Sequence, residues 1–191
     1  VASKLVGIPC VLHVRGFDIS MLLRYQIFKC ANKVIVLNDF AKQYLMKEYS
    51  YTKEKLAIIP NGVEINPLRR EKNKAGEALS ICYVGGYEKR KGIDTFFEFV
   101  KEARNLEGVK FYRIGSETPK DEESALLLSA NAELYDSQLL VDLGYRNDIQ
   151  ELFNGFDILL TTSYMEGMPR TILEAMERGV IPISVNIGPL E

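Results

Sequence analysis

Short runs of β-branched and other apolar residues alternate with longer amphipathic stretches along most of the chain. Compact apolar runs bounded by turn residues are typical of buried strands. The runs that predict strands are Pro9–Val14, Lys33–Leu37, Leu56–Ile59, Leu79–Val84, Val109–Ile114, Leu139–Leu143, Asp157–Thr161 and Val180–Val185.

The stretches between these runs carry apolar residues at helical spacing. One such set is Ile93, Phe96, Phe97, Val100 and Ala103, and another is Ile149, Leu152, Phe153 and Phe156. Helices are also predicted over Phe40–Glu48, Glu122–Leu134 and Thr171–Arg178. Because strands and helices alternate, the pattern favours parallel α/β units.

One charged segment without periodicity interrupts the alternation. It runs from residue 65 to residue 78 and contains Asn66-Pro67 and a cluster of arginines and lysines. We therefore predict a domain over residues 1–66, a linker over 67–78 and a second domain over 79–191. Strand-like runs lie close to both chain ends, so we expect both domains to be truncated parts of a longer protein.

Composition narrows the functional classes. The 191 residues include 24 basic and 26 acidic side chains, a balance without the signature of a nucleic-acid-binding protein. Cys10, Cys30 and Cys82 show no C-x-x-C spacing, which favours reduced thiols in a cytoplasmic protein. His13 is the single histidine, so a histidine-based metal site is implausible, and its mid-strand place favours a core role. No apolar run reaches transmembrane length.

The stretch from Glu166 to Glu174 holds the strongest candidate chemistry. It lies between a predicted strand and a predicted helix. Pro169 suits the first helical position, which makes Met168 the N-cap, a residue with no side-chain oxygen to accept from the first turn. The amides of residues 170–172 are then available to an anion.

Two carboxylates beside an anion site suggest a ligand that also offers hydroxyls, such as a nucleotide-sugar. The alternative is structural. If Ile172, Leu173 and Met176 form the buried stripe, Glu174 lies on the solvated face of the helix and Glu166 is a loop charge. From spacing alone the two interpretations stand about equal.

A glycine loop with three consecutive cations follows another strand. Gly85 and Gly86 come directly after Leu79–Val84, and Lys89–Lys91 come next. At the carboxyl end of a parallel strand, such a loop can approach and neutralise a phosphate. The structural alternative is an ordinary turn with a solvated basic face. The loop Gly144–Arg146 has a similar position and could abut a base.

Together these segments resemble the retaining nucleotide-sugar glycosyltransferases of family 4, which have the GT-B fold. The similar segments follow the family's order: Ile59–Glu64, Tyr83–Gly86 with Arg90–Asp94, Leu143–Tyr145, Phe156–Ser163, Glu166–Pro169, Leu173–Met176 and Ile187–Glu191. The resemblance implies an α/β protein of two Rossmann-like parallel-sheet domains, both truncated here. Residues 1–66 would end the acceptor-side domain, and 79–191 would form most of the donor-binding domain.

The resemblance also assigns residues. Glu174 would hold ribose hydroxyls, Glu166 would contact hydroxyls of the donor sugar, and Lys91 would bind the diphosphate. Glu166 and Lys91 are the implied catalytic residues. The implied donor-binding residues are Gly85, Gly86, Arg90, Lys91, Tyr145, Glu166, Gly167, Met168, Pro169, Arg170, Thr171, Ile172 and Glu174.

The sequence departs from the family pattern at two places. The family usually has an arginine where Gly86 stands, so one phosphate cation is missing, and Arg90 or Lys89 is a candidate replacement. It often has His-Gly where this chain has Arg15-Gly16, which removes a contact to donor or acceptor.

The implied reaction transfers a sugar from a nucleotide-diphosphate sugar to an acceptor hydroxyl with retention, as in polysaccharide biosynthesis. No metal or other cofactor is expected. The implied partners are the donor and a saccharide or lipid-linked acceptor, with no nucleic acid. We expect a cytoplasmic protein, with peripheral contact at the inner membrane face left open for Met21–Lys29. The fragment itself is expected to be inactive.

Two alternatives stay open: a non-catalytic or degenerate nucleotide-sugar-binding module, and a nucleotide-sugar epimerase of the same fold. A nicotinamide-dependent oxidoreductase is disfavoured, because Gly85-Gly86 lacks the third glycine of the dinucleotide fingerprint.

Overall fold

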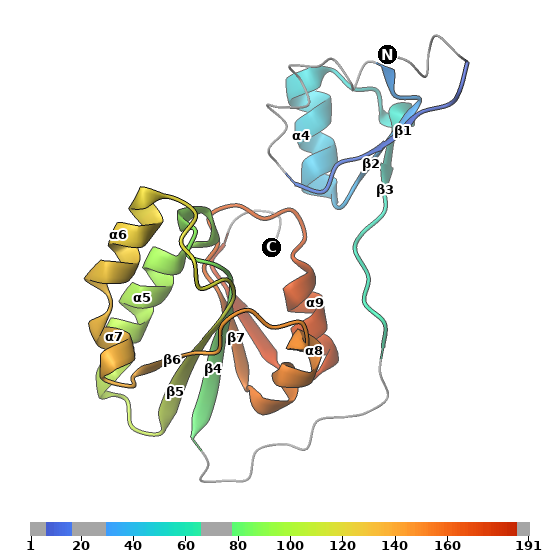
Figure 1. Cartoon of the computed structure of the whole chain (residues 1–191). Coiled ribbons are helices and arrows are strands. Elements are labelled where there is room, and N and C mark those ends of the chain that lie inside the picture. Colours follow the sequence, from blue (N-terminus) through green and yellow to red (C-terminus); the bar gives the residue numbers. More distant parts are fainter. Residues whose placement is uncertain (1–6, 17–29, 66–77, 187–191) are drawn as a thin grey trace. The chain divides into compact units, whose positions relative to one another are not determined.

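The computed structural model describes residues 7–16, 30–65 and 78–186, which fall into two compact units (Figure 1). The first unit is Val1–Gly62 with Met165–Pro169 and Asn186–Glu191, and the second is Val63–Tyr164 with Arg170–Val185. The stretch Met21–Lys29, the predicted linker except Ala78, and the segment Ile187–Glu191 lie outside the described residues.

The first unit contains a parallel sheet of order β1-β2-β3. Its strands are β1 (Val11–His13), β2 (Lys33–Val36) and β3 (Leu56–Ile58). In the central strand β2, Val34 and Val36 are fully buried, and Leu45 of the neighbouring helix is buried with them.

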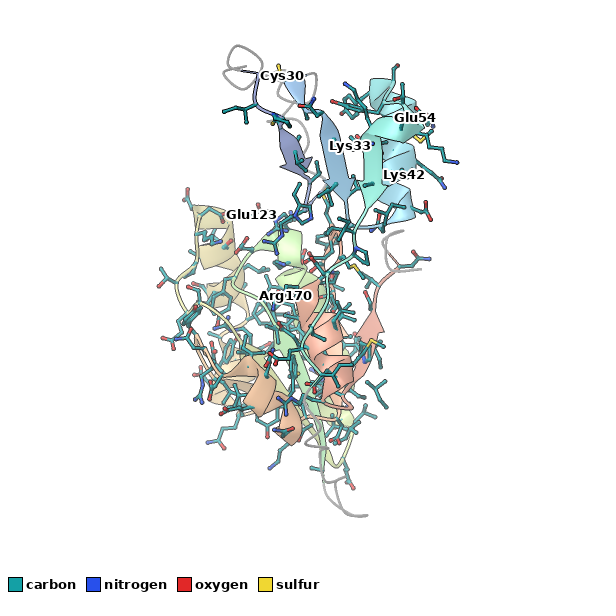
Figure 2. The ribbon with its side chains drawn as sticks, turned by 90° about the vertical axis from the view of Figure 1, so that its right-hand side faces the viewer. Cys30, Lys33, Lys42, Glu54, Glu123 and Arg170 are labelled. Atoms are coloured by element: carbon teal, nitrogen blue, oxygen red, sulfur yellow. The ribbon has the colours of Figure 1, made fainter. Side chains whose placement is uncertain are left out.

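The helix of the first unit, α4 (Asp39–Tyr49), has defined caps at both ends. The Asn38 side chain accepts a hydrogen bond from the Ala41 amide at 2.8 Å, and Ser50 ends the helix in the left-handed conformation. Lys33 and Glu54 lie near each other in Figure 2, where Lys33 Nζ donates to the Glu54 carbonyl. These local bonds fix the helix and its connection to the sheet.

The second unit contains a five-stranded parallel sheet of order β6-β5-β4-β7-β8. The strands are β4 (Leu79–Val84), β5 (Val109–Ile114), β6 (Leu140–Asp142), β7 (Ile158–Thr161) and β8 (Ile181–Ser184). Helices α5 (Ile93–Glu102), α6 (Glu122–Ala130) and α7 (Glu133–Asp136) cover one face, and α8 (Ile149–Leu152) and α9 (Arg170–Glu177) cover the other (Figure 1).

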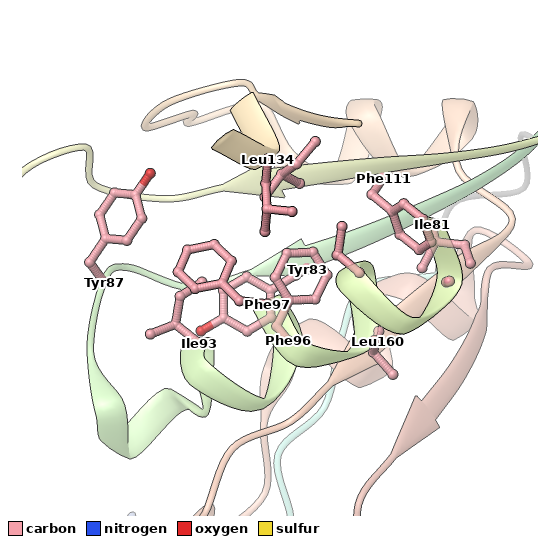
Figure 3. Close-up of a cluster of buried hydrophobic side chains, with 12 residues drawn as sticks. Ile81, Tyr83, Tyr87, Ile93, Phe96, Phe97, Phe111, Leu134 and Leu160 are labelled. Atoms are coloured by element: carbon pink, nitrogen blue, oxygen red, sulfur yellow. The ribbon is translucent and has the colours of Figure 1, made fainter. Parts of the chain in front are cut away.

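Strand β4 contributes to a hydrophobic core on each side of the sheet. Ile81 and Tyr83 belong to the cluster of Figure 3, where the Tyr83 ring stacks on Phe96 with ring centroids 4.7 Å apart. Cys82 belongs to the opposite cluster with Phe153 and other residues of that face. The alternation follows from the two-residue period of a strand, and burial on both faces explains why β4 reads as a continuous apolar run.

All eight predicted strands and their parallel arrangement are confirmed, and β4 and β5 have the predicted bounds. The helix predicted over Glu122–Leu134 is instead divided into α6 and α7. Asn131, which is 3% exposed, lies between them and donates from its side chain to the Leu127 carbonyl at 2.7 Å. A side chain that bonds the backbone in this way competes with the regular helix ladder.

One smaller expectation was wrong. His13, expected in the core, is exposed, because it lies on β1, an edge strand of its sheet. The helical pattern that begins at Ile149 is confirmed as the short helix α8 followed by a 3-10 turn over Phe153–Gly155. The predicted domain limits stay predictions. In the part of the chain that the structure describes, no helix is long and apolar enough to cross a membrane.

Candidate functional site

The order of the five-stranded sheet defines a topological switch point. Strands β4 and β7 are hydrogen-bonded neighbours, although more than seventy residues separate their starts. From β4 the chain proceeds outward to β5 and β6, whereas from β7 it proceeds outward to β8 in the other direction. Open α/β sheets bind ligands at the carboxyl ends of the strands at such a point. Here those ends lead into Gly85–Gly92 and into Thr162–Pro169.

The basic turn after β4 is held by its backbone. Lys89–Lys91 form a 3-10 helix that ends at Gly92, which has a φ of 70°. A Cβ atom at Gly92 would lie 1.8 Å from the Thr162 carbonyl oxygen, so only glycine fits this close approach. Thr162 Oγ1 donates to the Gly92 carbonyl at 2.7 Å, and Tyr83 Oη donates to the Lys91 carbonyl at 3.1 Å. The backbone at Lys91 and Gly92 is therefore held by Tyr83 of β4 and by Thr162, the residue after β7.

Tyr164, two residues after Thr162, adds a third connection between the segment after β7 and the basic turn. The Tyr164 amide donates to the Arg90 carbonyl at 3.1 Å, and the Tyr164 hydroxyl donates to Asp94 Oδ2 at 2.9 Å. The segment after β7 thus follows the basic turn as far as the first turn of α5. The Arg90 side chain is about half exposed, with Nη2 3.6 Å from Glu88 Oε2.

A fully buried arginine organises the neighbouring loops. Arg113 of β5 makes a two-nitrogen ion pair with Asp142 of β6, with Nη2 2.8 Å from Oδ1 and Nε 2.9 Å from Oδ2. Its other donors reach the carbonyl oxygens of Gly85 (3.0 Å), Gly115 (3.3 Å) and Ser116 (3.2 Å). One guanidinium therefore joins the segments that follow β4 and β5, and its ion pair extends the network to β6.

Two tyrosines and a backbone amide complete this network. The Arg113 guanidinium lies 4.0 Å from the centre of the Tyr87 ring, and the Tyr87 hydroxyl donates to Asp142 Oδ2 at 2.8 Å. The Tyr87 hydroxyl lies 3.0 Å from that of Tyr135. Burial, followed by these two hydrogen bonds, raises the pKa of Tyr87, so its phenol stays protonated. Asp142 also accepts from the Gly144 amide at 2.9 Å, which positions the loop before Tyr145.

Arg113 and Asp142 were not among the residues predicted from the sequence. One signal was available for Arg113, because Val109, Phe111 and Arg113 share one face of β5 by strict alternation and Phe111 is an obvious core residue. An arginine on a core face needs a buried partner. The identity of that partner depends on which strand lies beside β5, and spacing along the chain does not give it.

Helix α9 begins at Arg170, so Pro169 directly precedes it rather than opening it. A one-residue difference at a helix end is ordinary, and the first-turn amides are still those of residues 170–172. Arg170 is labelled in Figure 2 at this end, and its Nη2 lies 3.2 Å from Glu174 Oε1 one turn later. The Glu174 side chain is only 14% exposed, so the solvated-face alternative does not describe it.

The predicted buried stripe of α9 needs one correction. Met176 is 57% exposed, whereas Ala175 is fully buried. The helix packs through Ile172 and Ala175 against the hydrophobic cluster that contains Cys82. Thr171 and Ile172 are half-buried in the first turn.

The other predicted donor-binding residues divide between the units. Gly85, Gly86, Arg90 and Lys91 belong to the second unit, as does the strongly exposed Tyr145. The segment Met165–Pro169, with Glu166, Gly167 and Met168, belongs to the first unit. There the Gly167 carbonyl accepts from Asn38 Nδ2 at 2.9 Å, and the Met168 carbonyl accepts from Asn61 Nδ2 at 2.6 Å.

A metal centre built from protein ligands is not found within the described ranges 7–16, 30–65 and 78–186. No group of three or more His, Cys, Asp and Glu side chains there could hold one ion. Near the switch point, the second unit instead offers the cationic side chains of Lys89–Lys91 and the backbone amides at the start of α9.

Comparison with known proteins agrees with this architecture. The family model for glycosyl transferases group 1 matches residues 64–191. The Escherichia coli UDP-Gal:alpha-D-GlcNAc-diphosphoundecaprenol alpha-1,3-galactosyltransferase is 27% identical over 216 residues, covering 98% of this chain and 54% of that protein. A human component of phosphatidylinositol N-acetylglucosaminyltransferase is 23% identical over 197 residues, covering 97% of this chain and 40% of that protein. The chain thus spans about half the length of these curated relatives.

Solved structures show the same fold. The crystal structure of Anabaena Alr3699/HepE in complex with UDP and glucose has a TM-score of 0.79 at 20% identity, over 99% of this chain and 56% of that one. The lipopolysaccharide outer core galactosyltransferase WaaB, in its apo form, has a TM-score of 0.71 at 19% identity, over 96% of this chain and 51% of that one. With a family model that covers about two thirds of its length, this chain belongs to the glycosyl transferases group 1 family and has the α/β GT-B fold.

Proposed function

We propose that the protein is a retaining, family 4 glycosyltransferase that transfers a sugar from a nucleotide-diphosphate sugar to an acceptor hydroxyl. The observation that carries this proposal is the switch point between β4 and β7. There the turn Lys89–Gly92 is fixed by bonds from Tyr83 and Thr162, and helix α9 begins after the next segment. A fixed basic turn and a helix start suit a diphosphate.

In the proposed reaction the bond between the anomeric carbon of the sugar and the diphosphate oxygen breaks. The acceptor oxygen forms its bond to that carbon on the same face, and the acceptor proton passes to the departing phosphate oxygen. Lys91 and the amides of residues 170–172 stabilise the charge that develops on the diphosphate. In this proposal these groups face the diphosphate before it departs, so they need little reorganisation during the reaction.

The roles of the carboxylates follow from the resemblance and stay proposals. Glu174, held by Arg170 and largely covered, is assigned to the ribose hydroxyls. Glu166 is assigned to the donor sugar, and Gly85 with Gly86 lets the backbone approach the leaving group. Tyr145 and its loop are assigned to the base.

Relatives suggest which substrates to test first. The name of the Escherichia coli relative specifies UDP-galactose and a diphosphoundecaprenol-linked acceptor, and HepE was crystallised with UDP and glucose. We therefore propose a UDP-hexose donor and a saccharide or lipid-linked acceptor. We also propose that the protein meets this acceptor at a membrane surface through peripheral contact. The reaction is proposed to need no divalent metal.

A transfer assay on a full-length form tests this proposal. Labelled UDP-galactose, UDP-glucose and UDP-N-acetylglucosamine are each offered with a lipid-linked or oligosaccharide acceptor, with and without EDTA, and the anomeric proton of the product is read by NMR. We expect an α-linked product from an α-linked donor and no loss of rate with EDTA.

The alternatives give different outcomes in the same assay. A β-linked product would contradict retention, and loss of the reaction in EDTA would contradict metal independence. Donor binding without turnover would indicate the binding module, which the glycine at position 86 favours. Conversion of the donor without an acceptor would indicate an epimerase.

A further inference from the structure

Position 86 has space for the side chain that the family resemblance leads one to expect. A Cβ atom built on Gly86 would meet only Glu88 Oε1 at 3.5 Å and Ser116 Cβ at 3.9 Å, which are ordinary contacts. Glycine is therefore not required here by crowding, in contrast to Gly92. The question is which group supplies positive charge at this place in the present chain.

The carboxylate of Glu88 gathers cations beside Gly86. Lys120 Nζ lies 2.5 Å from Glu88 Oε1, the same oxygen that a side chain at position 86 would touch. The hydrogen bond from Lys120, more than any other contact, holds the pKa of Glu88 below its usual range. Lys120 comes from the loop after β5, the strand next to β4 in the sheet. Its ammonium is thus held next to the backbone of the glycine loop at Gly85 and Gly86.

The two replacements suggested by the sequence are less well placed. Lys89 Nζ lies 2.6 Å from Glu123 Oε1, so its charge is directed to helix α6. Arg90 contacts the other oxygen of Glu88 at the longer distance of 3.6 Å, and not the oxygen that a side chain at position 86 would touch. Among the cations of the described residues near Gly86, Lys120 has the shortest contact with the Glu88 carboxylate.

We propose that Lys120 supplies, from the neighbouring loop, the phosphate-binding charge that the family resemblance places at position 86. In the protein without ligand, Glu88 holds the ammonium beside Gly86. When a nucleoside diphosphate binds, the ammonium donates to a phosphate oxygen. The Lys120 side chain is 64% exposed on a flexible stem, so it can turn from one acceptor to the other. This inference rests on the proposed function, because its ligand is the diphosphate of the donor.

The test moves the charge between the two positions. In the full-length protein, affinity for UDP and for uridine is measured by calorimetry in the wild type, Lys120→Ala, Gly86→Arg and the double variant. We expect Lys120→Ala to weaken UDP about tenfold, as for loss of one charge-assisted hydrogen bond, and to leave uridine unchanged. Gly86→Arg should restore most of the UDP affinity in the Lys120→Ala background and add less to the wild type.

A matched variant and a second probe separate the outcomes. Lys101→Ala on α5, whose Nζ lies 3.2 Å from Glu98 Oε1, should bind UDP within about twofold of the wild type because this lysine is not part of the proposed donor site. Equal UDP affinity in Lys120→Ala and wild type, or an equal loss for UDP and uridine, would overturn the inference. Failure of the wild type to bind UDP, GDP or ADP at all would instead overturn the proposed function.

Discussion

At the scale of single residues, one buried charge connects the segments at the carboxyl ends of the second sheet. Arg113 has no exposed surface, and the acceptors of its hydrogen bonds lie at the carboxyl ends of β4, β5 and β6. An arginine in this position is stable only if each donor has an acceptor. The segments that follow β4 and β5 and the carboxylate of Asp142 supply those acceptors.

Replacement of Asp142 tests this dependence. In Asp142→Ala the buried guanidinium loses its carboxylate, and Tyr87 and Gly144 each lose an acceptor. We expect a loss of about 3–5 kcal/mol in the free energy of unfolding of the second unit, measured by urea denaturation.

A second aspartate provides the matched control. Asp148 also pairs with an arginine, Arg146, but both side chains are well exposed. Exposed pairs contribute little, so Asp148→Ala should leave the urea midpoint unchanged. Equal midpoints for the two variants would contradict the view that Arg113 depends on Asp142.

At the scale of elements, the basic turn after β4 is defined by one glycine. Gly92 ends the 3-10 helix and begins α5, and its backbone lies against the segment after β7, where Thr162 Oγ1 donates to its carbonyl. A side chain here would collide with the Thr162 carbonyl. The position of Lys91 therefore depends on the absence of a Cβ atom at the next residue.

Two alanine substitutions separate backbone conformation from close approach. Gly92 and Gly179 have φ values of 70° and 74°, but a Cβ atom at Gly179 has nothing within 4 Å. Gly179→Ala should lose about 1–2 kcal/mol from its left-handed conformation alone. Gly92→Ala should lose clearly more in the same urea titration, and it should also weaken nucleotide binding. Similar losses in the two variants would show that the contact with Thr162 does not constrain the turn.

The elements themselves could largely be predicted from the sequence. Strands β4 and β5 are compact apolar runs in the middle of the sheet. The ends of these runs therefore predicted the ends of the strands. The division between α6 and α7 could not be predicted, because it depends on a side-chain bond from Asn131 to Leu127. The basic turn was identified as a loop with candidate chemistry, but its 3-10 conformation depends on contacts with a segment seventy residues away.

At the scale of the whole molecule, the family and the fold agree. The chain has two α/β units with parallel sheets, and the strand order of its second unit has a switch point between β4 and β7, where open α/β sheets commonly bind ligands. The sequence resemblance led to the same architecture and to candidate residues near that point. It could not supply Lys120 or Arg113, because their importance depends on which loops lie side by side.

The affinity of a full-length form for UDP, measured by calorimetry in the wild type and in Glu174→Ala, tests the central claim most directly. Glu102→Ala, an exposed change at the end of α5, is the control. If Glu174 holds the ribose, its loss should weaken UDP at least about tenfold, with an unchanged thermal midpoint and unchanged binding in the control. A folded Glu174→Ala variant that binds UDP as tightly as the wild type would contradict the proposed donor site.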